Sequence, residues 1–199
     1  MEGVKFLWDS CFENVGLIAK GNKGSGCILA HCMGLGKTLT TITLIHTLLA
    51  NKTLTKVERV LVLVPVNVLN NWKNEITAWT SKCQHRINVY ELPTSASGGH
   101  NLVRTRLVEL ERWHKRGGVF LIGYQIFQIL ITGRNIKPKK LVEDFKKYLT
   151  NPGADLIVCD EGHFLKNEQT GLSKAVNQVK NDTLGALPLE TLFSGLLDS

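Results

Sequence analysis

Two patterns of apolar residues alternate along this chain of 199 residues. Continuous apolar runs, which are typical of strands buried on both faces of a parallel sheet, occupy residues 27–30, 60–64, 119–122 and 155–159. Apolar residues at helical spacing predict helices over residues 4–18, 39–49, 101–115, 124–131, 141–149 and 169–179. A shorter strand is predicted over residues 87–92. Strands that alternate with helices imply a mainly parallel sheet with helices on both faces.

One more helix is predicted after the strand at residues 60–64, which ends at Pro65. Asn67 is expected to cap this helix, because its side chain can accept a hydrogen bond from a first-turn amide. The apolar side of the helix consists of Leu69, Trp72, Ile76 and Trp79, which recur at helical spacing. We interpret these aromatic residues as part of the core rather than as a platform for stacking bases.

The last segment, residues 181–199, does not follow these patterns. It contains no Lys or Arg, three acidic residues, and leucines without a clear period. We expect either a poorly ordered tail or a helix that lacks the partner against which it would be buried.

The most specific chemical signal is a glycine-rich segment between the strand at residues 27–30 and the helix at residues 39–49. Gly34 and Gly36 allow backbone N–H groups to turn toward a phosphate chain without interference from a Cβ atom. Lys37 can then reach the phosphates, and Thr38 can offer its hydroxyl to Mg²⁺. The segment therefore matches a P-loop, except that His31 stands where the first glycine is usual.

A pair of carboxylates, Asp160 and Glu161, follows the apolar run at residues 155–159. The carboxyl ends of strands in open α/β sheets are where ligands bind. Asp160 can hold the Mg²⁺ that Thr38 also contacts, and Glu161 can orient and deprotonate the attacking water. An isolated Asp-Glu pair is usually a solvated turn, but two such strand-terminal motifs in the right order favour catalysis.

The composition narrows the class of protein. With 43% hydrophobic and 21% charged residues, a packed globular core is expected rather than disorder. No apolar run approaches the length that a membrane span requires, so no membrane association is expected. Five cysteines without a C-x-x-C pair favour a reducing compartment. The spacing of Cys27, His31 and Cys32 does not suit zinc, so no structural metal is expected.

The positive charge is unevenly distributed. Between Arg134 and Tyr148, six cations and two acids give a net charge of +4, within a chain whose total is +7. The patch includes Lys137, Lys139 and Lys140. Such a patch suits contact with phosphate backbones, and a solvated helix face is an equal alternative.

Together these motifs resemble the Swi/Snf family of DNA-translocating ATPases, which is helicase-like and belongs to superfamily two. Residues 26–39 resemble its motif I, and the pair His31-Cys32 resembles the ATRX-like branch, because most members have Asp-Glu there. Asp160 to His163 resembles motif II, and its extension over residues 165–168 is typical of the same group. A third similarity is to motif Ia, which matches residues 62–65 together with Leu69, Asn71, Trp72 and Glu75. The resemblance covers residues 3–180.

The resemblance implies a fold and a set of site residues. Residues 1–180 would form a helicase ATP-binding domain, the first RecA-like lobe, with the three-layer αβα architecture of P-loop NTPases. The implied ATP-binding residues are His31, Cys32, Met33, Gly34, Leu35, Gly36, Lys37, Thr38 and Leu39. Lys37, Asp160 and Glu161 would be catalytic, Thr38 and Asp160 would hold Mg²⁺, and Gly162 and His163 would complete motif II. Candidate DNA contacts are Pro65, Asn67 and Asn71, with Lys137, Lys139 and Lys140 as the rival patch.

The resemblance also indicates what these residues do not include. Family members have a second lobe that closes over ATP and supplies arginine fingers, and we expect it to be missing from this chain. Residues 181–185 stand where motif III is expected, which makes 181–199 a divergent, disordered tail. The glutamine that reads adenine would precede Met1. The chain would then be a fragment, a truncated gene product or the result of an imperfect gene model.

The function implied by the resemblance is that of an ATP-binding lobe of an ATRX-like, DNA-dependent ATPase. Its cofactors would be ATP and Mg²⁺, its partner double-stranded DNA in chromatin, and its location the nucleus. One alternative is a truncated nucleotide- or DNA-binding module with negligible turnover. A small-molecule kinase is a second alternative, although the motif from Asp160 to His163 and the lack of an acceptor-binding lid argue against it.

Overall fold

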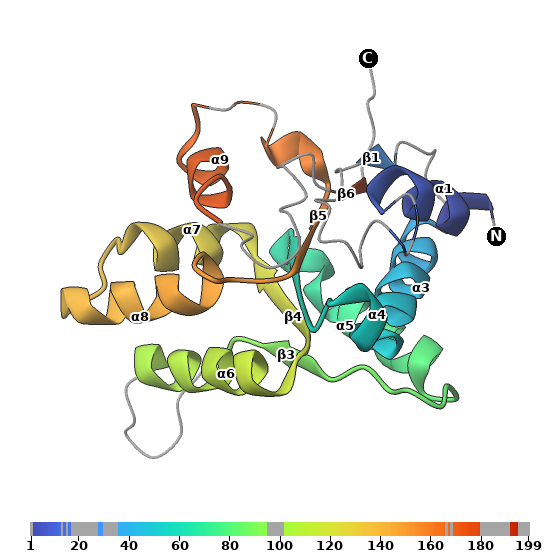
Figure 1. Cartoon of the computed structure of the whole chain (residues 1–199). Coiled ribbons are helices and arrows are strands. Elements are labelled where there is room, and N and C mark those ends of the chain that lie inside the picture. Colours follow the sequence, from blue (N-terminus) through green and yellow to red (C-terminus); the bar gives the residue numbers. More distant parts are fainter. Residues whose placement is uncertain are drawn as a thin grey trace.

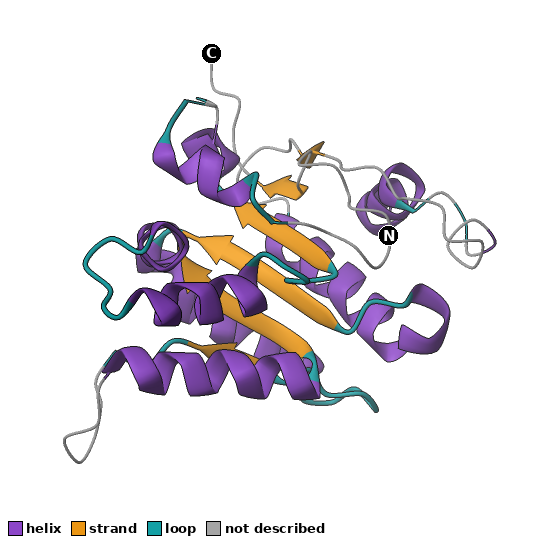
Figure 2. Cartoon of the chain, turned by 60° about the vertical axis from the view of Figure 1, so that its left-hand side comes forward, coloured by secondary structure: helices purple, strands orange, loops and turns teal. Residues whose placement is uncertain are grey.

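The computed structural model describes residues 2–12, 14, 16, 28–29, 36–94, 102–165, 167, 169–179 and 192–194. Within this part of the chain, a parallel sheet lies at the centre of the molecule (Figure 1, Figure 2). Its strand order is β1-β6-β5-β2-β4-β3. The strands are β1 (Ile28–Leu29), β2 (Arg59–Val64), β3 (Val89–Glu91), β4 (Gly118–Gly123), β5 (Leu156–Asp160) and β6 (Leu192–Ser194). The predicted α/β class with a mainly parallel sheet is confirmed.

Helices cover both faces of the sheet and make it the middle of three layers (Figure 1). On one face lie α1 (Glu2–Cys11), α3 (Lys37–Ala50) and α5 (Leu69–Thr80), and α4 (Lys52–Thr55) follows α3. On the other face lie α6 (Leu102–Arg116), α7 (Tyr124–Thr132), α8 (Lys139–Leu149) and α9 (Gly171–Val176). Two 3₁₀ turns, Val66–Val68 and Gly162–Leu165, follow β2 and β5. No helix in these described segments is long and apolar enough to cross a membrane.

The central strands supply side chains to both layers. In β2, Val60, Val62 and Val64 pack with α1, α3 and α5, whereas Leu61 and Leu63 pack with the helices of the opposite layer. This alternation follows from the strand geometry, in which successive side chains point to opposite faces. Burial on both faces explains why the strands appear in the sequence as continuous apolar runs.

The start of α5 differs from the prediction. Asn67 does not cap the helix, because the chain first makes the 3₁₀ turn Val66–Val68, and α5 begins only at Leu69. Val68 occupies the N-cap position without a side-chain hydrogen bond. The expectation that Asn67 would be the cap was therefore wrong.

The aromatic stripe on α5 is also only partly in the core. Trp72, Ile76 and Thr80 are buried and lie four residues apart, whereas Trp79 is 53% exposed. Because a spacing of four keeps the buried stripe on one face, Trp79 falls to the side of it. Trp72 is a core residue as predicted, and Trp79 is not.

Part of the terminal segment belongs to the sheet. Leu192–Ser194 forms β6, which pairs in parallel with β1 on one side and β5 on the other. This strand is neither of the two structures expected for the segment. The strand pairing was not visible in the sequence because three residues are too few to show a period.

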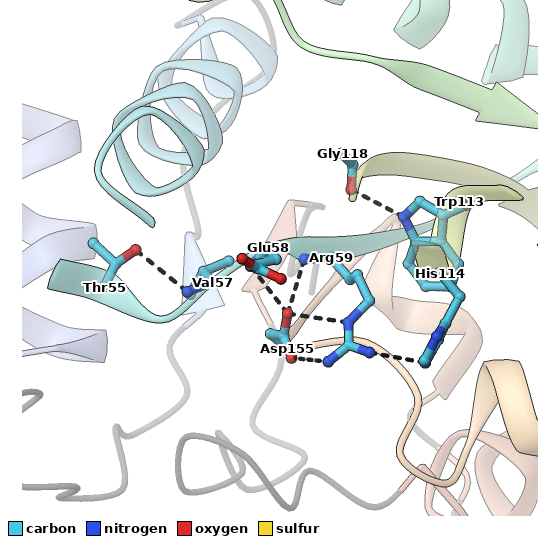
Figure 3. A network of polar contacts seen from close by, with 8 residues as sticks. All are labelled: Thr55, Val57, Glu58, Arg59, Trp113, His114, Gly118 and Asp155. Atoms are coloured by element: carbon cyan, nitrogen blue, oxygen red, sulfur yellow. Dashed lines mark hydrogen bonds and ion pairs between the residues drawn. The ribbon is translucent and has the colours of Figure 1, made fainter. Parts of the chain in front are cut away.

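A buried ion pair fixes the amino edge of the sheet (Figure 3). The Asp155 carboxylate, whose side chain is 3% exposed, accepts hydrogen bonds from the backbone N–H groups of Glu58 and Arg59 at 3.0 and 2.8 Å. Nη2 of Arg59 donates to the other oxygen at 2.8 Å, and its Nη1 donates to Nε2 of His114 at 2.8 Å. These bonds join the beginnings of β2 and β5 to α6.

Candidate functional site

The candidate site lies at the carboxyl edge of the sheet, where the chain leaves the strands. Asp160 is the last residue of β5 and pairs in register with Ser194, which in turn pairs with Leu29 at the end of β1. Two interstrand spacings, about 10 Å, therefore separate the backbone of Asp160 from the end of β1. Because all three strands are parallel, the segment that leads from β1 to α3 leaves the sheet at the same edge as Asp160.

Three hydrogen bonds hold Asp160 in place. The indole Nε1–H of Trp72 donates to Oδ2 at 2.8 Å, and the backbone N–H of Glu161 donates to Oδ1 at 3.0 Å. The hydroxyl of Tyr124 donates to the backbone carbonyl of Asp160 at 2.6 Å. Trp72 is almost fully buried, at 1% exposure, so its indole has little freedom to move. The carboxylate is thus oriented by α5 and by the residue that follows it.

The environment of Tyr124 keeps its phenol protonated. Burial raises the pKa of Tyr124 well above its ordinary value, and the nearby Cys159, Asp160 and Glu161 raise it further. The hydroxyl therefore remains a hydrogen-bond donor to the end of β5 at physiological pH.

Glu161 follows Asp160 in an unusual backbone conformation. Its φ is 56°, in the left-handed region that residues other than glycine seldom adopt. Such residues cost about 1–3 kcal/mol and are concentrated at functional sites. The conformation turns the chain sharply from β5 into the 3₁₀ turn, and it places the Glu161 N–H against Oδ1 of Asp160.

The start of α3 has the features that an anion requires. Gly36 is the N-cap, with φ of 73°, and among the described residues no atom beyond its chain neighbours and the backbone of its own helix lies within 4 Å of the position that a Cβ would take there. The first turn contains no acidic residue, so the partial positive charge of the helix N-terminus is not neutralised from within α3. Lys37 and Thr38 are half-buried at this end. The residues at this end of α3 therefore fit a phosphate chain.

The threonines of α3 differ in their bonding. The hydroxyls of Thr41, Thr43 and Thr47 each donate to the carbonyl four residues earlier, at 2.8–3.0 Å. Thr38 makes no such bond within the described segments. Its hydroxyl is thus available as an oxygen ligand, which is the type of ligand that Mg²⁺ prefers.

Several predicted residues cannot be placed. His31, Cys32, Met33, Gly34 and Leu35, together with Cys27, lie outside the described residues. Leu39 is on α3 and 36% exposed, and Gly162 and His163 are in the 3₁₀ turn after Glu161.

The structure separates the two groups of DNA candidates. Pro65 and Asn67 follow β2, the strand next to β5, and Asn71 lies one residue before Trp72 on α5. These three residues therefore lie at the same edge as Asp160. Lys137, Lys139 and Lys140 are exposed at the start of α8, which packs against α6 and α7 in the opposite layer.

Sequence reasoning missed the role of two aromatic residues. The sequence places Trp72 in the core and among the residues that resemble motif Ia, but its apolar spacing gives no sign that its N–H meets a carboxylate 88 residues away. Tyr124 had a usable signal, since it follows a buried strand, and such positions meet at the carboxyl edge of a parallel sheet.

Sequence comparison identifies the family. The model of the SNF2-related domain matches residues 1–184. The chain belongs to this family. Two relatives are the transcriptional regulator ATRX homolog of Drosophila melanogaster, 45% identical over 181 residues, and the transcriptional regulator ATRX of Homo sapiens, 44% identical over 183 residues. These alignments cover 89% and 91% of this chain but only 13% and 7% of the relatives.

A solved structure gives a weaker likeness. The UvsW helicase from bacteriophage T4 aligns with a TM-score of 0.48 and 14% identity, over 90% of this chain and 49% of that chain. The resemblance to an ATRX-like first lobe of the Swi/Snf family is confirmed by the family match and by the sequence relatives.

Proposed function

We propose that this chain is the ATP-binding lobe of a DNA-dependent ATPase that moves along double-stranded DNA during chromatin remodelling. The observation that carries the proposal is the Asp160 carboxylate, which is held by Trp72 and Glu161 at the edge where the chain passes from β1 to α3. Relatives named as transcriptional regulators support a place in the nucleus and chromatin as the partner.

Each site residue has a distinct role in this proposal. Lys37 binds and neutralises the phosphate chain, while Thr38 and Asp160 hold Mg²⁺ through oxygen atoms. Glu161 orients the attacking water and accepts its proton. ATP, when bound, would supply the phosphoanhydride bond that is hydrolysed. The accompanying Mg²⁺ would neutralise part of the negative charge on the phosphates. His31 to Leu35, which lie outside the described residues, are proposed to complete the phosphate cradle.

Pro65, Asn67 and Asn71 are the proposed contacts to the DNA backbone, because they share an edge with Asp160. Contacts to phosphate carry no sequence information and weaken steeply with salt. The exposed Lys137, Lys139 and Lys140 remain the rival patch.

Two substitutions test the nucleotide site by calorimetry. Lys37→Ala removes the cation that faces the phosphates, and we expect ATP affinity to fall about ten-fold or more. Glu161→Gln keeps size and hydrogen bonding but removes the base, so it is expected to retain ATP binding and to lose hydrolysis. Unchanged affinity in Lys37→Ala would refute the P-loop assignment. Hydrolysis by Glu161→Gln at the parental rate, measured by phosphate release in a polypeptide that contains both lobes, would refute the role of the base.

A further inference from the structure

A second concave site lies at the amino edge of the sheet, opposite Asp160. It is a pocket of about 270 Å³ formed where β2 and β4 begin and just before β3. Its lining includes Lys52, Glu58, Arg86, Ile87, Arg116 and Gly118. Nothing in the proposed ATPase uses these residues.

The pocket is strongly cationic. Four cations (Lys52, Arg86, Lys115 and Arg116) and one acid, Glu58, line it, which gives four minus one, or +3, with His85 neutral. Lys52 lies 3.8 Å from Glu58, and Lys115 lies 2.7 Å from Glu111. Neither Arg86 nor Arg116 has a carboxylate partner within the segments that the structure describes. Two guanidinium groups are therefore left to bind an external anion.

The backbone walls of the pocket are rigid. The N–H of Glu58 is held by the buried Asp155 (Figure 3). The N–H of Gly118 donates to the carbonyl of Glu58 at 2.8 Å. Gly117 has φ of 71°, and a Cβ there would meet the Glu58 carbonyl at 2.7 Å. Only glycine allows this close approach. These contacts hold the backbone wall of the pocket in place.

We propose that this pocket binds an anionic side chain of an acidic polypeptide segment. A guanidinium group matches the two oxygens of a carboxylate or a phosphate, so glutamate, aspartate and phosphoserine share the chemistry that it recognises. Leu49 and Ile87, which are almost buried at 5% and 9% exposure, give the pocket an apolar floor for the stem of such a side chain.

The charge pattern favours a peptide over nucleic acid. A DNA backbone needs a run of cations along its phosphates. Here Glu58 and Glu111 already pair with the two lysines, and a single pair of arginines is left in a small concavity. That arrangement suits one anionic group.

The test measures binding of labelled peptides to the whole chain by fluorescence anisotropy, without nucleotide. The probes are a glutamate-rich peptide, its glutamine counterpart and its phosphoserine counterpart. We expect the two anionic peptides to bind and the glutamine peptide not to bind. Tighter binding of either anionic peptide identifies the source of the anion.

The double variant Arg86→Gln/Arg116→Gln should weaken peptide binding about ten-fold or more. The matched control, Lys82→Gln/Lys174→Gln, removes the same two charges from exposed residues outside the pocket and should change affinity less than about two-fold. Circular dichroism confirms that both variants are folded.

Three results would overturn the proposal. Equal losses in both double variants would indicate attraction by net charge alone, and no binding of either anionic peptide would exclude a peptide site. If the arginine pair affects binding of duplex DNA but not of the peptides, the pocket is part of a nucleic-acid surface. Because no nucleotide is present, failure here leaves the proposed ATPase function untouched.

Discussion

At the scale of single residues, Trp72 links two parts of the site. It lies on the helix that follows the candidate DNA contacts, and its indole N–H meets the carboxylate proposed to hold Mg²⁺. Partners that orient a metal ligand are commonly as important as the ligand's own identity, and their loss lowers metal affinity about 10–100-fold. We therefore regard Trp72 as a positioning residue for Asp160.

Trp72→Phe tests this role, because phenylalanine keeps most of the apolar volume and removes only the donor. We expect the Mg²⁺ concentration needed for ATP binding to rise about ten-fold. The measurement is a Mg²⁺ titration of ATP binding by calorimetry, which does not depend on turnover.

Trp113→Phe is the matched control. Trp113 is also fully buried, and its Nε1–H donates to the Gly118 carbonyl at 3.0 Å, far from Asp160 along the sheet. Both variants should lose about 1–2 kcal/mol of stability from the lost hydrogen bond. If their Mg²⁺ titrations are alike, Trp72 serves only the core.

At the scale of elements, the junction of β2, β5 and α6 depends on the protonation of one histidine. Nη1 of Arg59 can only donate, so Nε2 of His114 must accept, and the ring is neutral. Burial lowers the pKa of His114 below its usual value of 6.5, and the charges of Arg59 and Lys147 lower it further, while Asp155 opposes them. Tyr148 packs edge-on against the ring.

The lowered pKa makes stability depend on pH. In the unfolded chain His114 binds a proton more readily than in the native protein, so its stabilising effect is present above pH 6.5 and is lost as pH falls through the lower native pKa. His114→Gln should therefore lose less stability between about pH 7.5 and about pH 5.5 than the parent.

Urea unfolding at the two pH values measures this difference. His85→Gln, which changes an exposed histidine, is the control and should behave as the parent does. A parental pH dependence in His114→Gln would show that the Arg59–His114 bond does not contribute.

At the scale of the whole molecule, the residues proposed to bind ATP all lie at one edge of the sheet. Lys37, Thr38, Asp160 and Glu161 come from a single lobe, and in the family that the sequence resembles a second lobe adds arginine. An arginine finger is worth about 10³–10⁵ in rate in related phosphoryl-transfer enzymes. Without closure, water also screens the charges of the site.

A polypeptide of these 199 residues should consequently bind ATP far better than it hydrolyses it. We expect duplex DNA to change its turnover little, because the assayed polypeptide has no second lobe that could close over ATP. Phosphate release measured with and without DNA tests this expectation. A turnover of about 1 s⁻¹ or more that DNA stimulates would show that one lobe suffices.

Local patterns in the sequence were enough to predict the class of fold, and they also indicated a P-loop type of site. The runs in β2, β4 and β5 show two-sided burial, and the periodic segments between them show helices, because each pattern is local in the chain. The resemblance of residues 26–39 and 160–168 to motifs I and II indicated the family, which the SNF2-related match confirms. The roles of the individual site residues remain proposals.

Only the tertiary structure decided which distant groups meet. The bond from Trp72 to Asp160, the network of Arg59, Asp155 and His114, and the place of β6 beside β5 each join residues far apart in the chain. Local patterns report burial, but they carry no information on the partner across the sheet. The exposure of Trp79 and the start of α5 at Leu69 also depend on how that helix packs on the sheet. The apolar spacing of the helix is compatible with Trp79 inside or outside the core, so the sequence did not distinguish the two.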